Sequence, residues 1–126
     1  MGTKLQSIVA DSFDVAVEAV GGILLYRRSD EGGEAQDVPC IAEPMDSVGR
    51  TEGAAVVAAL DLWDFFVKAD KLKIDDTQFL PARGDIIVHE GVNYIVTPMP
   101  GLTHFEFADP DRQILRIHAK DEGAAA

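Results

Sequence analysis

The sequence predicts a mainly β fold, a small antiparallel β-sandwich or β-barrel that carries an amphipathic helix at its N-terminus. Three observations lead to this class. A hairpin pattern occupies residues 79–98, a second hairpin pattern follows at 103–119, and helical periodicity is confined to residues 3–20. At 126 residues the chain is long enough for one modest core, so we interpret residues 1–126 as a single domain.

The hairpin at 79–98 shows the architecture most plainly. Pro81 ends the preceding segment, and Asp85 opens a run rich in β-branched residues. Glu90-Gly91 supplies the reversal, since glycine adopts positive φ without strain. The second strand reaches Thr97, and the prolines after it end it because they carry no backbone N–H.

The N-terminal segment predicts an amphipathic helix over residues 3–20, with apolar residues at steps of three and four. Gly21-Gly22 ends it, as glycine often does at a helix C-terminus. The apolar stripe requires a cover, which is either the β-domain of the same chain or a neighbouring subunit or partner. The stripe residues that form a candidate subunit or partner interface are Leu5, Ile8, Val9, Phe13 and Val17.

Two short strands are expected before the middle of the chain. Residues 23–28 form a β-branched and aromatic run, and residues 38–42 a second one, joined by a polar, glycine-rich loop at 29–36. Pro39 confines the second strand to a sheet edge, or sits among its first residues, because proline cannot donate to a ladder.

The second half of the chain supplies the remaining strands. After an exposed loop at about 43–53, residues 60–67 read as a strand with Trp63 and Phe65 on one face. The expected division is therefore an N-terminal helical segment, a β-domain with one long loop, and a flexible tail. The corresponding ranges are 1–22, 23–119 with the loop at about 43–53, and 120–126.

The charge balance limits the possible partners. The chain has 22 acidic and 11 basic side chains, for a formal charge of −11. Tight binding of nucleic acid is not expected, because that affinity depends on clustered lysine and arginine. The acidic side chains either keep the protein soluble or form a surface past which DNA moves without binding.

Cysteine usage and hydropathy give two further expectations. Cys40 is the only cysteine, so no intramolecular disulfide can form and a reducing compartment is the natural assumption. No window approaches the roughly 18 apolar residues of a transmembrane helix. We therefore expect a soluble protein made inside the cell, with no membrane partner.

The sequence offers little for catalysis. The spacing of His89, His104 and His118 matches no metal-binding signature, and each lies in or beside a predicted strand, which favours structural histidines. Cys40 could act as a nucleophile with one of them, but no local motif supports this. We predict no catalytic, cofactor-binding or metal site, and hence a protein that is not an enzyme.

One stretch of the sequence resembles a known family. Residues 80–87 read Leu-Pro-Ala-Arg-Gly-Asp-Ile-Ile, and residues 90–96 read Glu-Gly-Val-Asn-Tyr-Ile-Val. A Pro-x-x-Gly-Asp-x-Ile strand entry, a glycine turn and Tyr-x-Val are similar to tailed-phage neck proteins of the head-tail joining, head-closure or head completion family. The segments at 66–72 and 107–118 resemble the same family, so the similarity covers residues 66–120.

The resemblance implies a structural virion protein made in the host cytoplasm. Such a protein forms a homo-oligomeric ring, contacts neighbouring neck, portal-adaptor or tail proteins, joins head to tail, and helps to close or line the DNA channel. DNA would pass through without tight binding. The candidate acidic channel or contact residues are Asp30, Glu31, Glu34, Glu43, Asp46 and Glu52.

Two other function classes remain open at this stage. One is a non-enzymatic β-barrel adaptor or peptide-binding module in a cellular complex, and the other, weaker one is an enzyme that uses Cys40 or a histidine. Portal, capsid and tail genes beside this one would favour the neck protein. Loss of activity without loss of folding after a single substitution at Cys40 would favour the enzyme.

Overall fold

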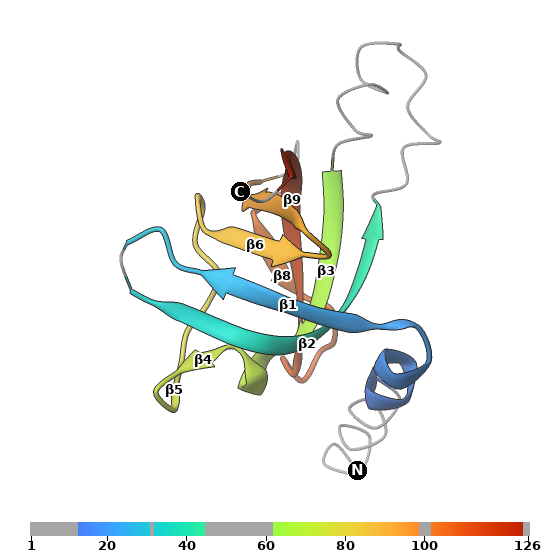
Figure 1. Ribbon diagram of the computed structural model, residues 1–126. Helices are drawn as coiled ribbons and strands as arrows, with labels where there is room; N and C mark the ends of the chain where they lie inside the picture. Colours follow the sequence, from blue (N-terminus) through green and yellow to red (C-terminus); the bar gives the residue numbers. More distant parts are fainter. Residues whose placement is uncertain (1–12, 31, 45–61, 99–101, 125–126) are drawn as a thin grey trace.

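Strand pairing in the computed structural model closes a six-stranded antiparallel barrel (Figure 1). The structure describes residues 13–30, 32–44, 62–98 and 102–124. The strand order is β3-β2-β1-β6-β7-β9, and β9 pairs back onto β3, while the short β8 lies beside β9. The strands are β1 (Gly22–Arg27), β2 (Glu34–Pro44), β3 (Leu62–Lys68), β4 (Lys73–Ile74), β5 (Thr77–Gln78), β6 (Ile86–His89), β7 (Val92–Val96), β8 (Phe105–Phe107) and β9 (Ile114–Ala124). The predicted fold class is confirmed.

The β6–β7 hairpin has the register expected from its turn. Glu90 and Gly91 both have positive φ, 50° and 79°, which defines the type I′ geometry that suits a two-residue hairpin loop. Ile86 then pairs with Ile95 across the two strands. The turn of the small β4–β5 hairpin also has two residues with positive φ, Asp75 at 52° and Asp76 at 66°.

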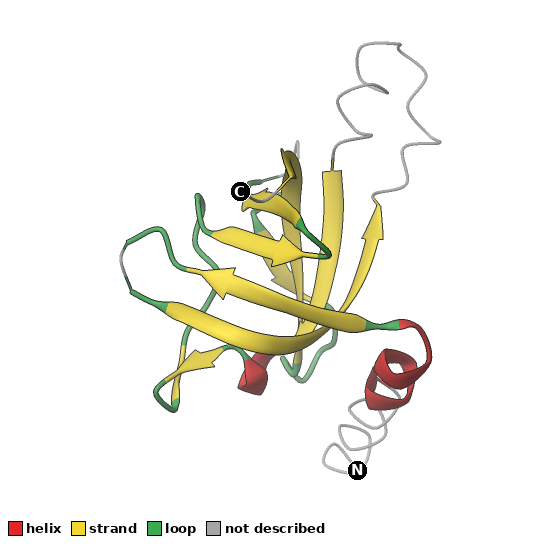
Figure 2. Ribbon diagram, in the orientation of Figure 1, coloured by secondary structure: helices red, strands yellow, loops and turns green. Residues whose placement is uncertain are grey.

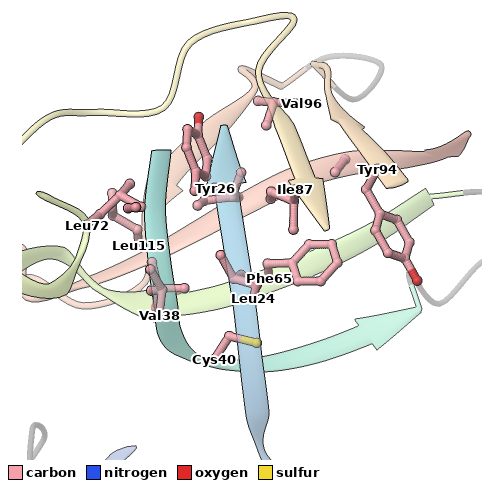
Figure 3. Close-up of a cluster of buried hydrophobic side chains, with 14 residues drawn as sticks. Leu24, Tyr26, Val38, Cys40, Phe65, Leu72, Ile87, Tyr94, Val96 and Leu115 are labelled. Atoms are coloured by element: carbon pink, nitrogen blue, oxygen red, sulfur yellow. The ribbon is translucent and has the colours of Figure 1, made fainter. Parts of the chain in front are cut away.

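Alternation along the strands builds the core (Figure 3). Phe65 and Val67 on β3, and Leu115 and Ile117 on β9, point inward and are fully buried. The inward face predicted from Phe65 in the strand at 60–67 is therefore correct. Leu72, from the charged connection between β3 and β6, is also fully buried and closes part of the barrel interior.

The second strand is longer than the sequence suggested. β2 begins at Glu34, inside the predicted loop 29–36, and includes Glu43 and Pro44, which the prediction placed in a loop; residues 45–53 lie outside the described residues. Pro39 lies in the middle of β2, but in a stretch that pairs only with β1, so it occupies the edge position that the sequence predicted. It is tolerated because β2 pairs with β3 only from Cys40 onward, so no bond to β3 is lost.

The C-terminal tail is a second correction. Residues 120–124 are not a free tail but continue β9, and they pair with Val92–Ile95 of β7. β9 pairs with β3 along one edge and with both β8 and β7 along the other. The β7–β9 ladder has a register shift between Asn93 and Tyr94. The extension at 120–124 completes the barrel, because without it β7 would pair with β9 only through Val96 and Ala119.

Residues 13–20 form a helix that ends where the sequence predicted, at Gly21 (Figure 2). The backbone N–H of Gly21 donates to the carbonyl of Val17 at 2.8 Å. Asp14 forms an ion pair of 3.2 Å with Lys68 at the end of β3. The helix is thus held against the barrel of its own chain over these residues. No helix in the described part of the chain is long and apolar enough to cross a membrane.

Replacement of Gly21 by alanine is expected to lower the free energy of unfolding by about 1–3 kcal/mol. A β-carbon there would lie 2.6 Å from the carbonyl oxygen of Cys40 and 2.7 Å from Cα of Val17, so backbone would have to move. Gly22→Ala is the matched control, since its β-carbon would meet only the His89 side chain at 3.3 Å. Urea unfolding of both variants checks this, and equal losses would contradict it.

Candidate functional site

The family-like stretch at 80–87 builds a buried carboxylate network rather than an exposed site. Asp85 is 1% exposed. One carboxylate oxygen accepts the Tyr26 hydroxyl at 2.5 Å and the backbone N–H of Ala82 at 2.9 Å. The other accepts the backbone N–H and the hydroxyl of Ser29, at 2.8 and 3.0 Å. Gly84, with a φ of 92°, allows the tight turn that brings Asp85 beside Ala82.

This network is structural in its chemistry. Burial raises the pKa of Tyr26 far above its usual range, and the hydrogen bond to Asp85 adds to the shift. The tyrosine is therefore a permanent donor at any ordinary pH. Its effect is to join β1 to the turn before β6, and so to fix the start of the hairpin.

Cys40 and His89 do lie near each other, with Sγ 3.9 Å from Nδ1. However, Nδ1 lies 2.9 Å from the carbonyl oxygen of Ile23, a partner that requires a proton on this nitrogen. The thiol is fully buried, and burial together with nearby Glu90 raises the pKa of Cys40 to about 11. A protonated thiol facing a protonated nitrogen lacks the thiolate that nucleophilic catalysis needs.

A second charged cluster lies on the outer face of β3, β8 and β9. Asp64 is 4% exposed and accepts hydrogen bonds from His118 Nδ1 at 2.6 Å and from Arg116 Nε and a terminal nitrogen, at 3.0 and 2.7 Å. The other ring nitrogen of His118 has no hydrogen-bond partner in the described part of the chain and lies 3.6 Å from Glu106. The pairing of β3 with β9 creates the cluster, because it sets Asp64 directly opposite His118.

Hydrogen bonds and neighbouring charges shift the pKa values of two members of this cluster. Burial alone would raise the pKa of Asp64, but the hydrogen bonds from His118 and Arg116 hold it below its usual value. The hydrogen bond to Asp64 raises the pKa of Arg116, as do the neighbouring charges of Glu106 and Glu43. Arg116 also lies over the ring of Phe66, with 5.7 Å between the guanidinium carbon and the ring centroid.

The lowered pKa of Asp64 predicts a pH dependence of stability. A carboxyl whose folded pKa lies below its unfolded value stabilises the fold above about pH 4, and this contribution is lost as the pH falls through the folded pKa. Asp64→Asn should therefore unfold with a shallower acid dependence than the unchanged protein. Urea unfolding at a series of pH values between about 6 and 2 measures this. Parallel curves for the two proteins would contradict it.

The predicted acidic residues are not gathered in one place. Asp30 and Glu34 are exposed near the start of β2, where they pair with Arg28 and Arg27 at 3.0 and 2.7 Å. Glu43 is exposed at the opposite end of β2, nine residues after Glu34, which at the rise of an extended strand is at most about 30 Å. Three of the predicted residues, Glu31, Asp46 and Glu52, lie outside the described residues.

The predicted helix interface is described only in part. Phe13 is 8% exposed and Val17 is half-buried in the single chain. Leu5, Ile8 and Val9 lie outside the described residues. Among the described residues the exposed apolar side chains near this helix are Val15, Val20 and Ile23.

The surface of the described chain has shallow hollows. One of about 330 Å³ lies between the end of the helix and the rim of the barrel, beside Val20, Trp63, His89 and Glu90. A second, of about 240 Å³, lies beside Leu25, Asp37 and Val88. No group of three metal-ligating side chains converges among the residues the structure describes.

The comparison with protein families decides the assignment. The sequence matches the family described as phage head-tail joining protein over residues 6–126, nearly its whole length. The chain belongs to the phage head-tail joining family. No curated protein and no solved structure matches it significantly.

The family match extends what the sequence resemblance covered. The resemblance began at residue 66, whereas the head-tail joining match includes the helix, β1 and β2 as well. The head-tail joining family is structural and non-enzymatic, and membership indicates a virion component that interacts with neighbouring head and tail proteins. The Asp64 cluster was missed from sequence because its members come from strands about 50 residues apart. Their shared outward face was predictable, but the register that brings them together was not.

Proposed function

We propose that this head-tail joining protein forms a homo-oligomeric ring in the neck of a tailed phage, between the portal-proximal proteins and the tail. The family match over residues 6–126 is the observation that carries the proposal. The fold suits the role, because a closed barrel has few open strand edges and presents its outer faces to neighbours. The ring is assembled from chains made in the host cytoplasm.

We further propose that the ring helps to close or line the DNA channel. Asp30 and Glu34 are exposed carboxylates near the start of β2, in a chain with a net charge of −11. A lumen lined by carboxylates lets a duplex slide, since no phosphate is neutralised and no counterion is released. The support is the charge and exposure of these residues, together with the family.

Genetic removal of the chain tests the neck role. Cells producing the phage without this protein should accumulate DNA-filled heads and separate tails, and supplying the protein in trans should restore joined particles. Electron microscopy of the lysates distinguishes these outcomes. Normal, infectious tailed particles made without the chain would overturn the proposal.

A binding measurement tests the channel role separately. The purified protein should leave the mobility of a short DNA duplex unchanged at physiological salt. A retarded complex at micromolar protein that weakens steeply with added salt would show phosphate neutralisation and would contradict an acidic sliding surface.

A further inference from the structure

Two faces on opposite sides of the barrel differ in their chemistry. In the closed order of strands, β6 and β3 are separated by two strands in either direction, so the outer faces centred on them point away from each other. Cyclic assembly by head-to-tail contacts requires two different surfaces on opposite sides of each subunit. The barrel topology provides such a pair.

The aliphatic face lies on the outside of β1, β6 and β7. Its outward direction follows from alternation, since the residues between its members belong to the core. Leu25 pairs directly with Val88, and Ile86 with Ile95, so four aliphatic side chains form two adjoining cross-strand pairs, all partly exposed. The face consists of Leu25, Arg27, Ile86, Val88, Asn93 and Ile95.

This face is unusual for a strongly acidic protein. Its six residues include no carboxylate, and their one charged side chain is the cation Arg27. Two acids, Asp37 and Glu90, line the hollow at its border beside Val88. The side chain of Arg27 is 51% exposed and uses Nε to bind Glu34 at the border of the face. Contiguous aliphatic side chains with few charges are a feature that the centres of protein contacts share.

The acidic face lies on the outside of β2, β3, β8 and β9. Ile41 pairs with Phe66, which lies beside Arg116, and these three give the face a partly exposed apolar centre. The face carries three carboxylates, those of Glu43, Asp64 and Glu106, and one guanidinium, that of Arg116. It therefore has a surplus of two negative charges when His118 is neutral. The face consists of Ile41, Glu43, Asp64, Phe66, Glu106 and Arg116.

We propose that the aliphatic face of one copy docks on the acidic face of the next copy, and that this contact builds the ring. The apolar centres then cover each other, and Arg27 meets the surplus of negative charge left by Glu43 and Glu106. A second copy is the occupant that fits, because the two faces belong to one chain, complement each other in charge and lie on opposite sides. Elsewhere the acid excess of the chain makes copies repel one another.

A mixture of two variants, each altered in one of the two faces, tests the contact. Val88→Glu places a carboxylate in the aliphatic face, and Ile41→Glu does the same in the acidic face. Each variant alone should associate about a hundredfold or more weakly than the unchanged chain, because a carboxylate would be buried unpaired. An equimolar mixture should form a one-to-one dimer and nothing larger, since only one intact contact remains between the two variants.

The matched control is Leu80→Glu, which places the same charge at an apolar residue that is 54% exposed and outside both faces. Sedimentation velocity over a range of concentrations, with thermal unfolding to confirm that each variant folds, gives the readout. The control should associate like the unchanged protein.

Three results would overturn the contact: an unchanged chain that stays monomeric at every concentration, a mixture that yields no dimer, and a control as impaired as the variants. The inference rests on the ring of the proposed function, but it can fail independently. If deletion of the gene separates heads from tails while these variants still assemble, the neck role stands and the faces assigned here are wrong.

Discussion

Asp85→Ala is expected to lower the free energy of unfolding by about 3–5 kcal/mol. Four donors lose their acceptor at once: the Tyr26 hydroxyl, the backbone N–H of Ala82, and the N–H and hydroxyl of Ser29. Tyr26 and Asp85 are almost completely buried, so water cannot easily replace the lost bonds. Chemical unfolding monitored by circular dichroism measures the change.

Two further variants show whether the effect comes from the network. Tyr26→Phe removes a single donor and should cost about 1–2 kcal/mol, whereas Glu18→Ala, at an exposed position in the helix, should change stability by less than about 0.5 kcal/mol. An Asp85→Ala protein within about 1 kcal/mol of the unchanged one would show that the network is dispensable.

Asp64→Ala is expected to lower the free energy of unfolding by about 2–4 kcal/mol. The substitution leaves His118, which is 1% exposed, and the guanidinium of Arg116 without their acceptor. The loss stays below that of a fully buried ion pair because 39% of the Arg116 side chain is exposed and can be solvated. Urea unfolding at neutral pH gives the value.

Glu106→Ala is the comparison for this second effect. The Glu106 side chain is 42% exposed and lies 3.6 Å from His118, beyond hydrogen-bond distance. Its removal should cost less than about 1 kcal/mol. If Glu106→Ala proved as damaging as Asp64→Ala, the stability of the cluster would depend on its exposed rim rather than on the buried carboxylate.

The hairpins were predictable because their signals are local. Gly91 marks the turn because glycine adopts positive φ without strain, and the strands on either side follow from alternation. The core-facing residues Phe65 and Val67 on β3, and Leu115 and Ile117 on β9, alternate as a strand requires, whereas the outward-facing Asp64 and His118 are buried against each other. The errors fell at strand ends. Residues 43–44 and 120–124 are strand because they pair with β3 and β7, which no local pattern reveals.

By itself the sequence determined the β class, the hairpin turns, the end of the helix at Gly21 and the acidity, because each depends on neighbouring residues or on composition. Only the tertiary structure decided that β9 closes a barrel, that Asp85 joins β1 to the hairpin, and that Asp64 meets Arg116 and His118. The same pairing places an aliphatic and an acidic face on opposite sides of the barrel. The physical reason is register: strand pairing between remote segments chooses which side chains become neighbours, and no local pattern encodes that choice.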